Sequence, residues 1–262
     1  MSTPSSRFPL AGAIAVVTGA SSGLGRRMAT ELALHGAVVT AVARRRERLE
    51  QVADELRRRS ADSGYAVCDV SDTDGFVALL REVEDEHGRI DVLVNDAGIG
   101  EPEGEGLAPY RKVMETNFFA PVAGTLAVLP GMRARHHGAV VNVSSDSGRA
   151  PTPGEAAYSA SKAALSAFTE ALSFEVERDG VHLHVLYPGW VPTEMTQPER
   201  DARRLPPKLV RRTDDQIAEL LIRGLGGPRL ELDATRIARL APVGRALFPR
   251  TYRRGLRAAM PE

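Results

Sequence analysis

Short runs of β-branched residues alternate with longer segments of helical periodicity along most of this chain, and this alternation is the strongest constraint on its fold. The runs that we predict to be strands are Ile14–Thr18, Val38–Ala43, 65–68, Val92–Asn95, 140–144 and 182–187. The segments that we predict to be helices are 23–35, 46–59, Thr73–His87, 110–136 and 156–179. Because the strands are too far apart for hairpins, a helix must connect each strand to the next. We therefore predict an α/β fold with a doubly wound parallel sheet.

The pattern changes after Trp190, where prolines at 192, 198, 206 and 207 interrupt a charged segment. We predict a substrate lid over residues 190–213, followed by a helix over Asp214–Gly224. A short strand at 230–232 would complete a sheet of about seven strands. Residues 233–262 read as a C-terminal extension, and the absence of a linker before residue 190 favours a single domain over residues 1–262.

The extension carries many arginines, with Leu240, Val243, Leu247 and Leu256 among them. This pattern predicts an amphipathic helical tail that caps its own domain. The alternative is that the tail lies on a membrane surface or on a partner helix.

Composition excludes several classes of protein. The 34 basic residues balance 34 acidic ones, so no net field favours nucleic acid, a membrane surface or a polyanionic partner. Cys68 is the only cysteine, which excludes an internal disulfide and a cysteine-based zinc site. His182 and His184 share a strand face, but no third ligand is evident, so we predict no metal site.

The sequence also carries no targeting signal that we recognise. Residues 1–9 lack the apolar core of a signal peptide. No uncharged apolar run approaches the ~20 residues that span a bilayer. We therefore predict a cytoplasmic protein with no integral membrane segment.

A glycine-rich turn with the spacing GxxxGxG follows the first predicted strand and opens a helix. The turn consists of Thr18, Gly19, Ala20, Ser21, Ser22, Gly23, Leu24 and Gly25. Glycines let the backbone turn tightly and approach a pyrophosphate, while the free N–H groups of the helix face it. The serine hydroxyls add hydrogen-bond donors. This context indicates a nucleotide site, although the spacing differs from the GxGxxG fingerprint.

Tyr158 and Lys162 lie four residues apart in a predicted helix, so their side chains share one face. The chain contains only three lysines among its 34 basic residues. A lysine at this position therefore suggests a role that the broad guanidinium of arginine cannot fill. A compact cation beside a phenol favours the phenolate, and the pair forms a candidate proton donor. The alternative is an exposed pair on a solvated helix.

From 13 to about 232 the chain resembles the short-chain dehydrogenase/reductase family, which has a Rossmann fold. The resemblance rests on several motifs in order, each at the end of a predicted strand or in a facing helix. They are Thr18–Gly25, Asp69-Val70, Asn95-Asp96-Ala97-Gly98, Asn117, Ser145, Tyr158-xxx-Lys162 and Pro188-Gly189-Trp190-Val191-Pro192-Thr193. Open α/β sheets bind their ligands at this edge.

The resemblance implies a catalytic tetrad of Asn117, Ser145, Tyr158 and Lys162. Ser144 competes with Ser145, but the serine of the family lies thirteen residues before the tyrosine, which selects Ser145. Tyr158 would protonate the developing alkoxide, with its pKa lowered by Lys162, and Ser145 would donate a hydrogen bond to the same oxygen. Lys162 would also hold the nicotinamide ribose. Asn117 would fix a water that connects the lysine to solvent.

The resemblance also implies the cofactor contacts. These residues are Gly19, Ser21, Ser22, Gly23, Leu24, Gly25, Arg44, Asp69, Val70, Asn95, Ala97, Gly98, Tyr158, Lys162, Pro188, Gly189, Val191 and Thr193. Asp69 would accept a hydrogen bond from the adenine amino group. Asp96 departs from the family pattern, because a second asparagine is commonest there. This departure puts in doubt a hydrogen bond beneath the sheet.

Charge at the end of the second strand predicts the cofactor. A site for NAD(H) needs an acid there to bind the ribose 2′-hydroxyl. Here Ala43 stands at that position and Arg44, Arg45 and Arg46 follow. Because an arginine fork suits a phosphate, we predict NADP(H) in preference to NAD(H). The alternative is that the arginines only begin a solvated helix.

These observations predict an oxidoreductase that interconverts a carbonyl and an alcohol with NADP(H). The alternatives are an NADP-binding regulator without turnover, and an enoyl reductase or epimerase of the same family. The resemblance further implies a homodimer or homotetramer. Trp190 and Met195 suggest an apolar substrate, whereas the arginines of the lid permit an anionic one such as an acyl thioester.

Overall fold

A computed structural model describes residues 8–197, 205 and 207–258 of the chain. A seven-stranded sheet forms its centre, in the order β3-β2-β1-β4-β5-β6-β7, and every pair of neighbouring strands is parallel. The strands are β1 (Ile14–Thr18), β2 (Val38–Ala43), β3 (Gly64–Val67), β4 (Val92–Asn95), β5 (Gly138–Val143), β6 (Val181–Tyr187) and β7 (Glu231–Asp233). The predicted doubly wound parallel sheet is confirmed.

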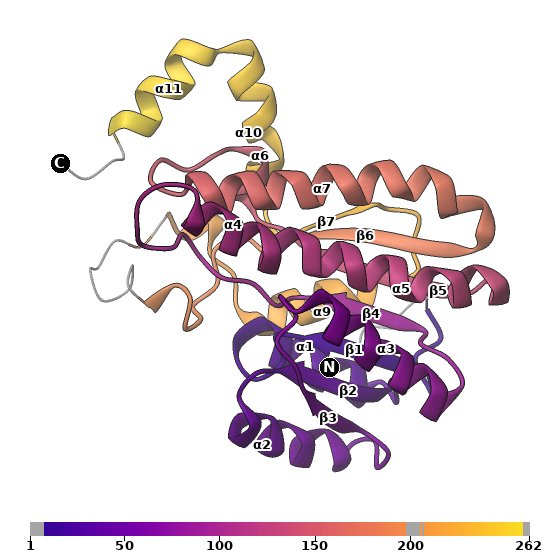
Figure 1. Ribbon diagram of the computed structural model, residues 1–262. Helices are drawn as coiled ribbons and strands as arrows, with labels where there is room; N and C mark the ends of the chain where they lie inside the picture. Colours follow the sequence, from indigo (N-terminus) through magenta and orange to yellow (C-terminus); the bar gives the residue numbers. More distant parts are fainter. Residues whose placement is uncertain (1–7, 198–204, 206, 259–262) are drawn as a thin grey trace.

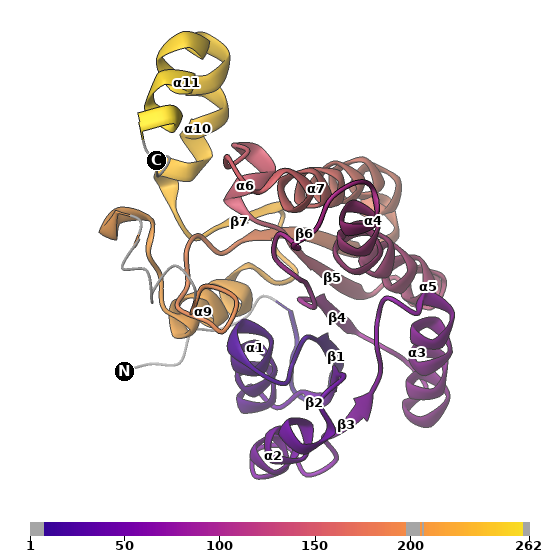
Figure 2. The ribbon, with the colours of Figure 1, turned by 60° about the vertical axis from the view of Figure 1, so that its left-hand side comes forward.

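Helices cover both faces of this sheet (Figures 1 and 2). One face carries α1 (Gly23–Leu34), α2 (Arg46–Arg57) and α9 (Asp214–Gly224). The other carries α3 (Thr73–His87), α4 (Ala108–Met114), α5 (Ala120–Arg135) and α7 (Ala156–Val176). The remaining helices are α6 (Asp146–Arg149), α10 (Arg236–Leu247) and α11 (Pro249–Ala258), and η2 (Glu177–Asp179) and η3 (Lys208–Val210) are 3₁₀ turns.

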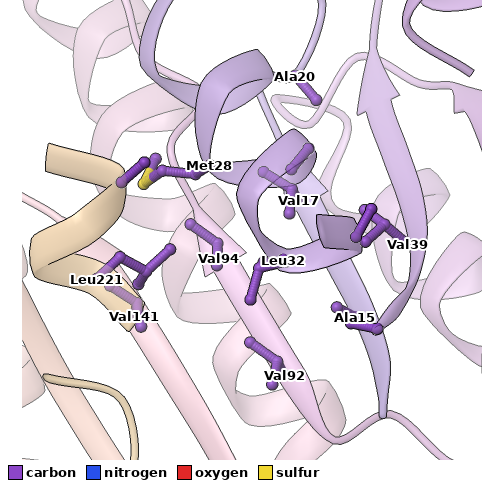
Figure 3. Packing of buried hydrophobic residues seen from close by; sticks show 14 of the residues in the cluster. Ala15, Val17, Ala20, Met28, Leu32, Val39, Val92, Val94, Val141 and Leu221 are labelled. Atoms are coloured by element: carbon purple, nitrogen blue, oxygen red, sulfur yellow. The ribbon is translucent and has the colours of Figure 1, made fainter. Parts of the chain in front are cut away.

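Alternation along the central strands builds a core on each face. In β1, Ala15 and Val17 join the cluster under α1, α2 and α9, whereas Ile14 and Val16 join the cluster under α3, α5 and α7. Successive side chains of a strand point to opposite faces, so a strand buried on both faces is apolar throughout. Figure 3 shows the first cluster, with side chains of α1 and α9 over those of β1, β4 and β5.

The predicted helix 110–136 is the largest departure from the sequence analysis. The structure divides it into α4, a π-helical turn η1 (Glu115–Phe119) and α5. Pro121 has no N–H group and cannot donate the i→i+4 hydrogen bond to the carbonyl of Asn117, which accounts for the change of helical pitch. π-helical turns are frequent at functional sites.

Smaller differences concern element ends. β3 spans 64–67 rather than 65–68, β5 spans 138–143 rather than 140–144, and β7 spans 231–233 rather than 230–232. The predicted tail contains two helices, α10 and α11. Residues 1–7, 198–204, 206 and 259–262 lie outside the described residues, and they include parts of the predicted domain, lid and tail.

Candidate functional site

A cavity of about 550 Å³ lies at the carboxyl ends of the strands, across the point between β1 and β4 where the strand order reverses. This is the position at which open α/β sheets bind ligands. Most of the predicted site residues line it. They are Gly19, Ser21, Ser22, Gly23, Leu24, Arg44, Asp69, Val70, Ala97, Gly98, Ser145, Tyr158, Lys162, Pro188, Gly189, Val191 and Thr193. Gly25, Asn95 and Asn117 are not in its lining.

The glycine turn approaches the backbone after β4 too closely for a larger residue. Gly19 has φ +70°, and a Cβ there would lie 2.9 Å from the amide nitrogen of Ala97. A Cβ at Gly25 would lie 2.7 Å from the carbonyl oxygen of Gly19. Thr18 holds the two segments together, since its hydroxyl accepts hydrogen bonds from the amides of Asp96 and Ala97 at 3.0 and 3.1 Å.

The amino end of α1 faces this cavity without a side-chain cap. Ser22 is the N-cap residue, but its hydroxyl makes no capping hydrogen bond. The first N–H groups of a helix have no intrahelical partner, and together with the helix dipole they favour an anion. The turn and the helix end therefore fit the pyrophosphate of a dinucleotide.

Two arginines line the adenosine side of this predicted site. Arg44 lies 3.6 Å from Asp69, in an ion pair between two partly exposed side chains. Arg45 donates hydrogen bonds to the hydroxyls of Ser21 and Ser22 at 2.9 and 2.8 Å. Sequence reasoning selected Arg44 and did not include Arg45 in the site. The run of three arginines contained the signal, but it could not show which side chain reaches the glycine turn.

Glu194 is a second residue that the sequence analysis missed. Its carboxylate accepts a hydrogen bond from Arg45 at 2.9 Å and also pairs with Arg48 of α2. Glu194 belongs to the predicted lid and lines the cavity. Two guanidinium groups thus converge on one anionic group beside the glycine turn.

Lys162 is buried at the inner end of the cavity, where its ammonium donates a hydrogen bond to the carbonyl of Val143 at 2.8 Å. Burial lowers the pKa of Lys162 to about 8, and the nearby Asp96 carboxylate opposes this shift. Burial raises the pKa of Asp96 to about 7, against the opposing effects of Lys162 and a hydrogen bond from the Gly25 amide. The charges of Asp96, the unusual residue of the fourth-strand motif, and Lys162 therefore influence each other's pKa.

Tyr158 and Ser145 meet at the same end of the cavity. Burial raises the pKa of Tyr158 to about 12, whereas a hydrogen bond with Ser145 lowers it. The ammonium of Lys162, which we expected to lower this pKa, lies 5.9 Å from the centre of the tyrosine ring and donates to Val143. In this structure the phenol is therefore a weak acid that remains protonated at neutral pH.

The neighbouring Ser144 has a different position. Its hydroxyl donates to the carbonyl of Lys162 at 3.0 Å and lies 2.8 Å from the hydroxyl of Ser166. These bonds attach α7 to the end of β5. The hydroxyl of Ser145 accepts a hydrogen bond from the amide of Ser147 at the start of α6, and the resemblance-based choice of Ser145 remains a prediction.

Asn117 acts on the site from behind the cavity wall. Its side-chain amide accepts from the amide of Ile99 and donates to the carbonyl of Ile99, both at 2.9 Å. It also donates to the hydroxyl of Ser161 at 3.1 Å. This side chain fastens the loop after β4 to α7, and its position in the π-helical turn η1 brings it there.

Asn95 likewise lies beneath the cavity. It donates to the side chain of Asn142 at 2.8 Å, and Asn142 donates to Thr169 of α7 at 2.9 Å. This buried chain of hydrogen bonds links β4, β5 and α7.

Glu101 caps the amino end of α7, a role that the sequence analysis did not predict. Its carboxylate accepts from the amide of Tyr158 at 2.8 Å and from the amide of Ala157 at 3.2 Å. Glu155, the N-cap residue of α7, makes no capping hydrogen bond with its side chain. Carboxylates are favourable at helix amino ends. A residue 57 positions earlier therefore orients the first turn of α7, which carries Tyr158.

His184, one of the two histidines that share a face of β6, forms hydrogen bonds with the backbone. Nδ1 of His184 lies 2.8 Å from the carbonyl oxygen of Arg229, and Nε2 accepts a hydrogen bond from the amide of Gly226 at 3.2 Å. Within the part of the chain that the structure describes, no group of three His, Cys, Asp or Glu side chains is arranged to hold a metal.

Known proteins resemble this chain in sequence and in fold. A sequence model described as short chain dehydrogenase matches residues 13–204. A short chain dehydrogenase of Pseudocercospora fijiensis is 41% identical over 195 residues, which cover 72% of this chain and 63% of that protein. A fatty acyl-CoA reductase of Mycobacterium tuberculosis is 38% identical over 206 residues, which cover 75% of this chain and 69% of that protein.

Among solved structures, that of an actinorhodin polyketide ketoreductase variant with NADPH has a TM-score of 0.77 and 30% sequence identity. The likeness covers 86% of this chain and 96% of that chain. The chain belongs to the short-chain dehydrogenase family of Rossmann-fold oxidoreductases. It spans 63% of the length of its relative from Pseudocercospora fijiensis.

The burial of Asp96 makes stability depend on pH in a definite direction. An aspartate in an unfolded chain has a pKa of ~3.9, whereas that of Asp96 in the folded chain is about 7. Between these values the folded state holds a proton that the unfolded state has released, so the free energy of unfolding falls as pH rises. Asp96→Asn has no titratable group at this position and should therefore lack this fall in the free energy of unfolding. Chemical denaturation at several pH values should show the variant gaining stability relative to the parent from about pH 4 to about pH 7.

Asp62→Asn, at an exposed turn, is the matched control for the substitution itself. A stability difference between parent and Asp96→Asn that stays constant over this pH range would contradict the buried aspartate.

Proposed function

We propose that this chain reduces a carbonyl to an alcohol, reversibly, and that NADPH supplies the hydride when bound. The observation that carries the proposal is the placement of the Tyr158 phenol, hydrogen-bonded to Ser145, beside buried Lys162 at one end of the cavity. The glycine turn and the amino end of α1 lie at the cavity as well. A proton donor and an anion-binding cradle therefore share one cavity.

Tyr158 supplies the proton in this reaction. With its pKa raised to about 12, the phenol is protonated near neutral pH and can donate to the developing alkoxide oxygen. The hydroxyl of Ser145 donates a hydrogen bond to the same oxygen and so stabilises negative charge there. Both residues line the cavity beside buried Lys162, where a local dielectric constant below that of water strengthens these interactions.

Lys162 supplies positive charge near the reacting oxygen. Its pKa of about 8 keeps the ammonium mostly charged at neutral pH, even though the side chain is buried. The Asp96 carboxylate favours the charged ammonium. The same ammonium would also hold the nicotinamide ribose, and Asn117 would fix a water that connects it to solvent.

The arginines beside the glycine turn support a preference for NADP(H). Arg44 and Arg45 both line the cavity, and Arg45 already holds an anionic group, the carboxylate of Glu194. Guanidinium groups bind phosphate oxygens in the same bidentate manner. The structural neighbour that contains NADPH is consistent with this assignment.

The outer part of the cavity would hold the substrate. Ile99, Thr116 and Met195 line the cavity, and the predicted lid supplies Met195. Ile99 and Met195 favour a carbonyl on an apolar group, and one relative is named as a fatty acyl-CoA reductase. We further propose a cytoplasmic homodimer or homotetramer, with residues 1–262 as a single domain, 190–213 as the lid and 233–262 as the extension.

Replacement of Tyr158 by phenylalanine tests the chemistry. A panel of ketones, aldehydes and alcohols is assayed with NADP(H), and Tyr158→Phe should lower turnover of any accepted substrate by roughly 10²–10⁴-fold, since general acid catalysis contributes about this much. Binding of NADPH, measured by fluorescence, should survive. Turnover undiminished in the variant would refute Tyr158 as the acid. Cofactor binding without turnover on any substrate would favour a regulator. Reduction of a carbon–carbon double bond would favour an enoyl reductase.

Loss of Arg45 tests the preference for NADP(H). Arg45→Ala should weaken the binding of NADPH by about 10–100-fold, because hydrogen bonds to charged groups contribute about 1.5–3 kcal/mol. NADH, which lacks the 2′-phosphate, should be affected less, so the ratio of the two dissociation constants should fall. Arg46→Ala is the matched control, since Arg46 contacts Tyr65 and does not line the cavity. Tighter binding of NADH than of NADPH by the parent protein would contradict the assignment.

A further inference from the structure

The helices α10 and α11 form a hairpin that stands away from the sheet and its covering helices (Figures 1 and 2). Every side chain described from Arg239 to Arg257 is exposed or only partly buried. We expected this tail to cap its own domain through its apolar residues. The structure instead leaves Leu240, Val243 and Leu247 exposed, so this part of the hairpin has an unpartnered surface.

One face of α11 carries a row of arginines. Arg250, Arg253, Arg254 and Arg257 follow the spacing i, i+3, i+4 and i+7, which places them on one side of a helix. All four are exposed, and none forms an ion pair with a described residue. Residues 236–258 contain no aspartate or glutamate. The positive charge of this face is therefore not neutralised within the hairpin.

An apolar stripe runs along α10. Leu240, Val243 and Leu247 follow the spacing i, i+3 and i+7, and they are 63%, 51% and 66% exposed. Phe248, at the connection between the helices, is 65% exposed. Contiguous exposed apolar side chains of this size mark an interaction site rather than an ordinary surface.

We propose that this hairpin binds the surface of an anionic lipid bilayer. Apolar side chains on one helix and arginines on the next are the two components of interfacial membrane binding, since the first enter the acyl boundary and the second pair with anionic headgroups. A second copy of the same face is a poorer occupant, because two such faces would bring their arginines together. Within the described residues, every helix is too short or too polar to span a bilayer, so the binding is peripheral.

The base of the hairpin lies beside the candidate active site. α10 contacts α6 and η3, and α6 begins directly after Ser145. The hydroxyl of Thr235, the N-cap residue of α10, donates to the carboxylate of Asp146 at 3.4 Å. If the proposed function holds, a bound bilayer would therefore lie close to the mouth of the cleft, where an apolar carbonyl substrate enters.

Vesicle co-sedimentation of the full chain tests the surface. We expect binding to vesicles of phosphatidylcholine with phosphatidylglycerol, weak binding to phosphatidylcholine alone, and release by salt. The variant Arg250→Gln/Arg253→Gln/Arg254→Gln/Arg257→Gln should bind at least roughly 100-fold more weakly. Leu240→Ser/Leu247→Ser should also weaken binding, and it leaves the charge unchanged.

The matched control removes the same charge elsewhere. Arg58→Gln/Arg81→Gln/Arg111→Gln/Arg178→Gln changes four exposed arginines outside the hairpin and should bind as the parent does. Tyr158→Phe should bind vesicles normally, which separates this proposal from the proposed chemistry. Equal binding to neutral vesicles, no binding, or equal loss in the control would overturn the proposal. If the parent does not bind vesicles but self-associates, and the hairpin variants abolish this self-association, the surface would belong to an interface with a second copy of the chain.

Discussion

The hydrogen bond from the Lys162 ammonium to the Val143 carbonyl joins helix α7 to the end of β5, and the candidate site is arranged around it. A buried ammonium is costly unless polar groups and an opposite charge surround it. Here the carbonyl supplies a polar partner, and the coupled Asp96 supplies the charge. The site therefore depends on keeping one cation charged in a place that water hardly reaches.

Contacts from several elements keep α7 in the position that this bond requires. Ser144 bonds to the backbone of Lys162, Asn117 bonds to Ser161, and Asn142 bonds to Thr169. Glu101 caps the first turn, in which Tyr158 lies. These partners belong to different strands and loops, so the orientation of the phenol is set by the whole parallel sheet. Removing one buried partner would leave another polar group unsatisfied, which typically costs about 1–3 kcal/mol.

Strand periodicity predicted the sheet, and the glycine spacing predicted the turn, because both are local signals in the sequence. Most other cavity residues were implied only by the resemblance to the short-chain dehydrogenase/reductase family. Pro121 could have indicated the break in helix 110–136, since its effect on the Asn117 carbonyl is also local. Glu101 and Glu194 could not be predicted, because their partners are 57 and 149 positions away. The sequence could not predict where the tail lies relative to the rest of the domain. Its amphipathic spacing is visible in the sequence, but whether another element covers its apolar stripe depends on tertiary structure.

Titration of Lys162 tests the central claim most directly. The chain contains only three lysines, and Lys112 and Lys208 are exposed. A variant with Lys112→Arg and Lys208→Arg keeps Lys162 alone, so the NMR spectrum of carbon-13-labelled lysine shows a single side-chain signal. The structure predicts that this signal titrates with a pKa of about 8. A pKa near the ~10.4 of lysine in water would contradict the buried ammonium on which this account of the site rests.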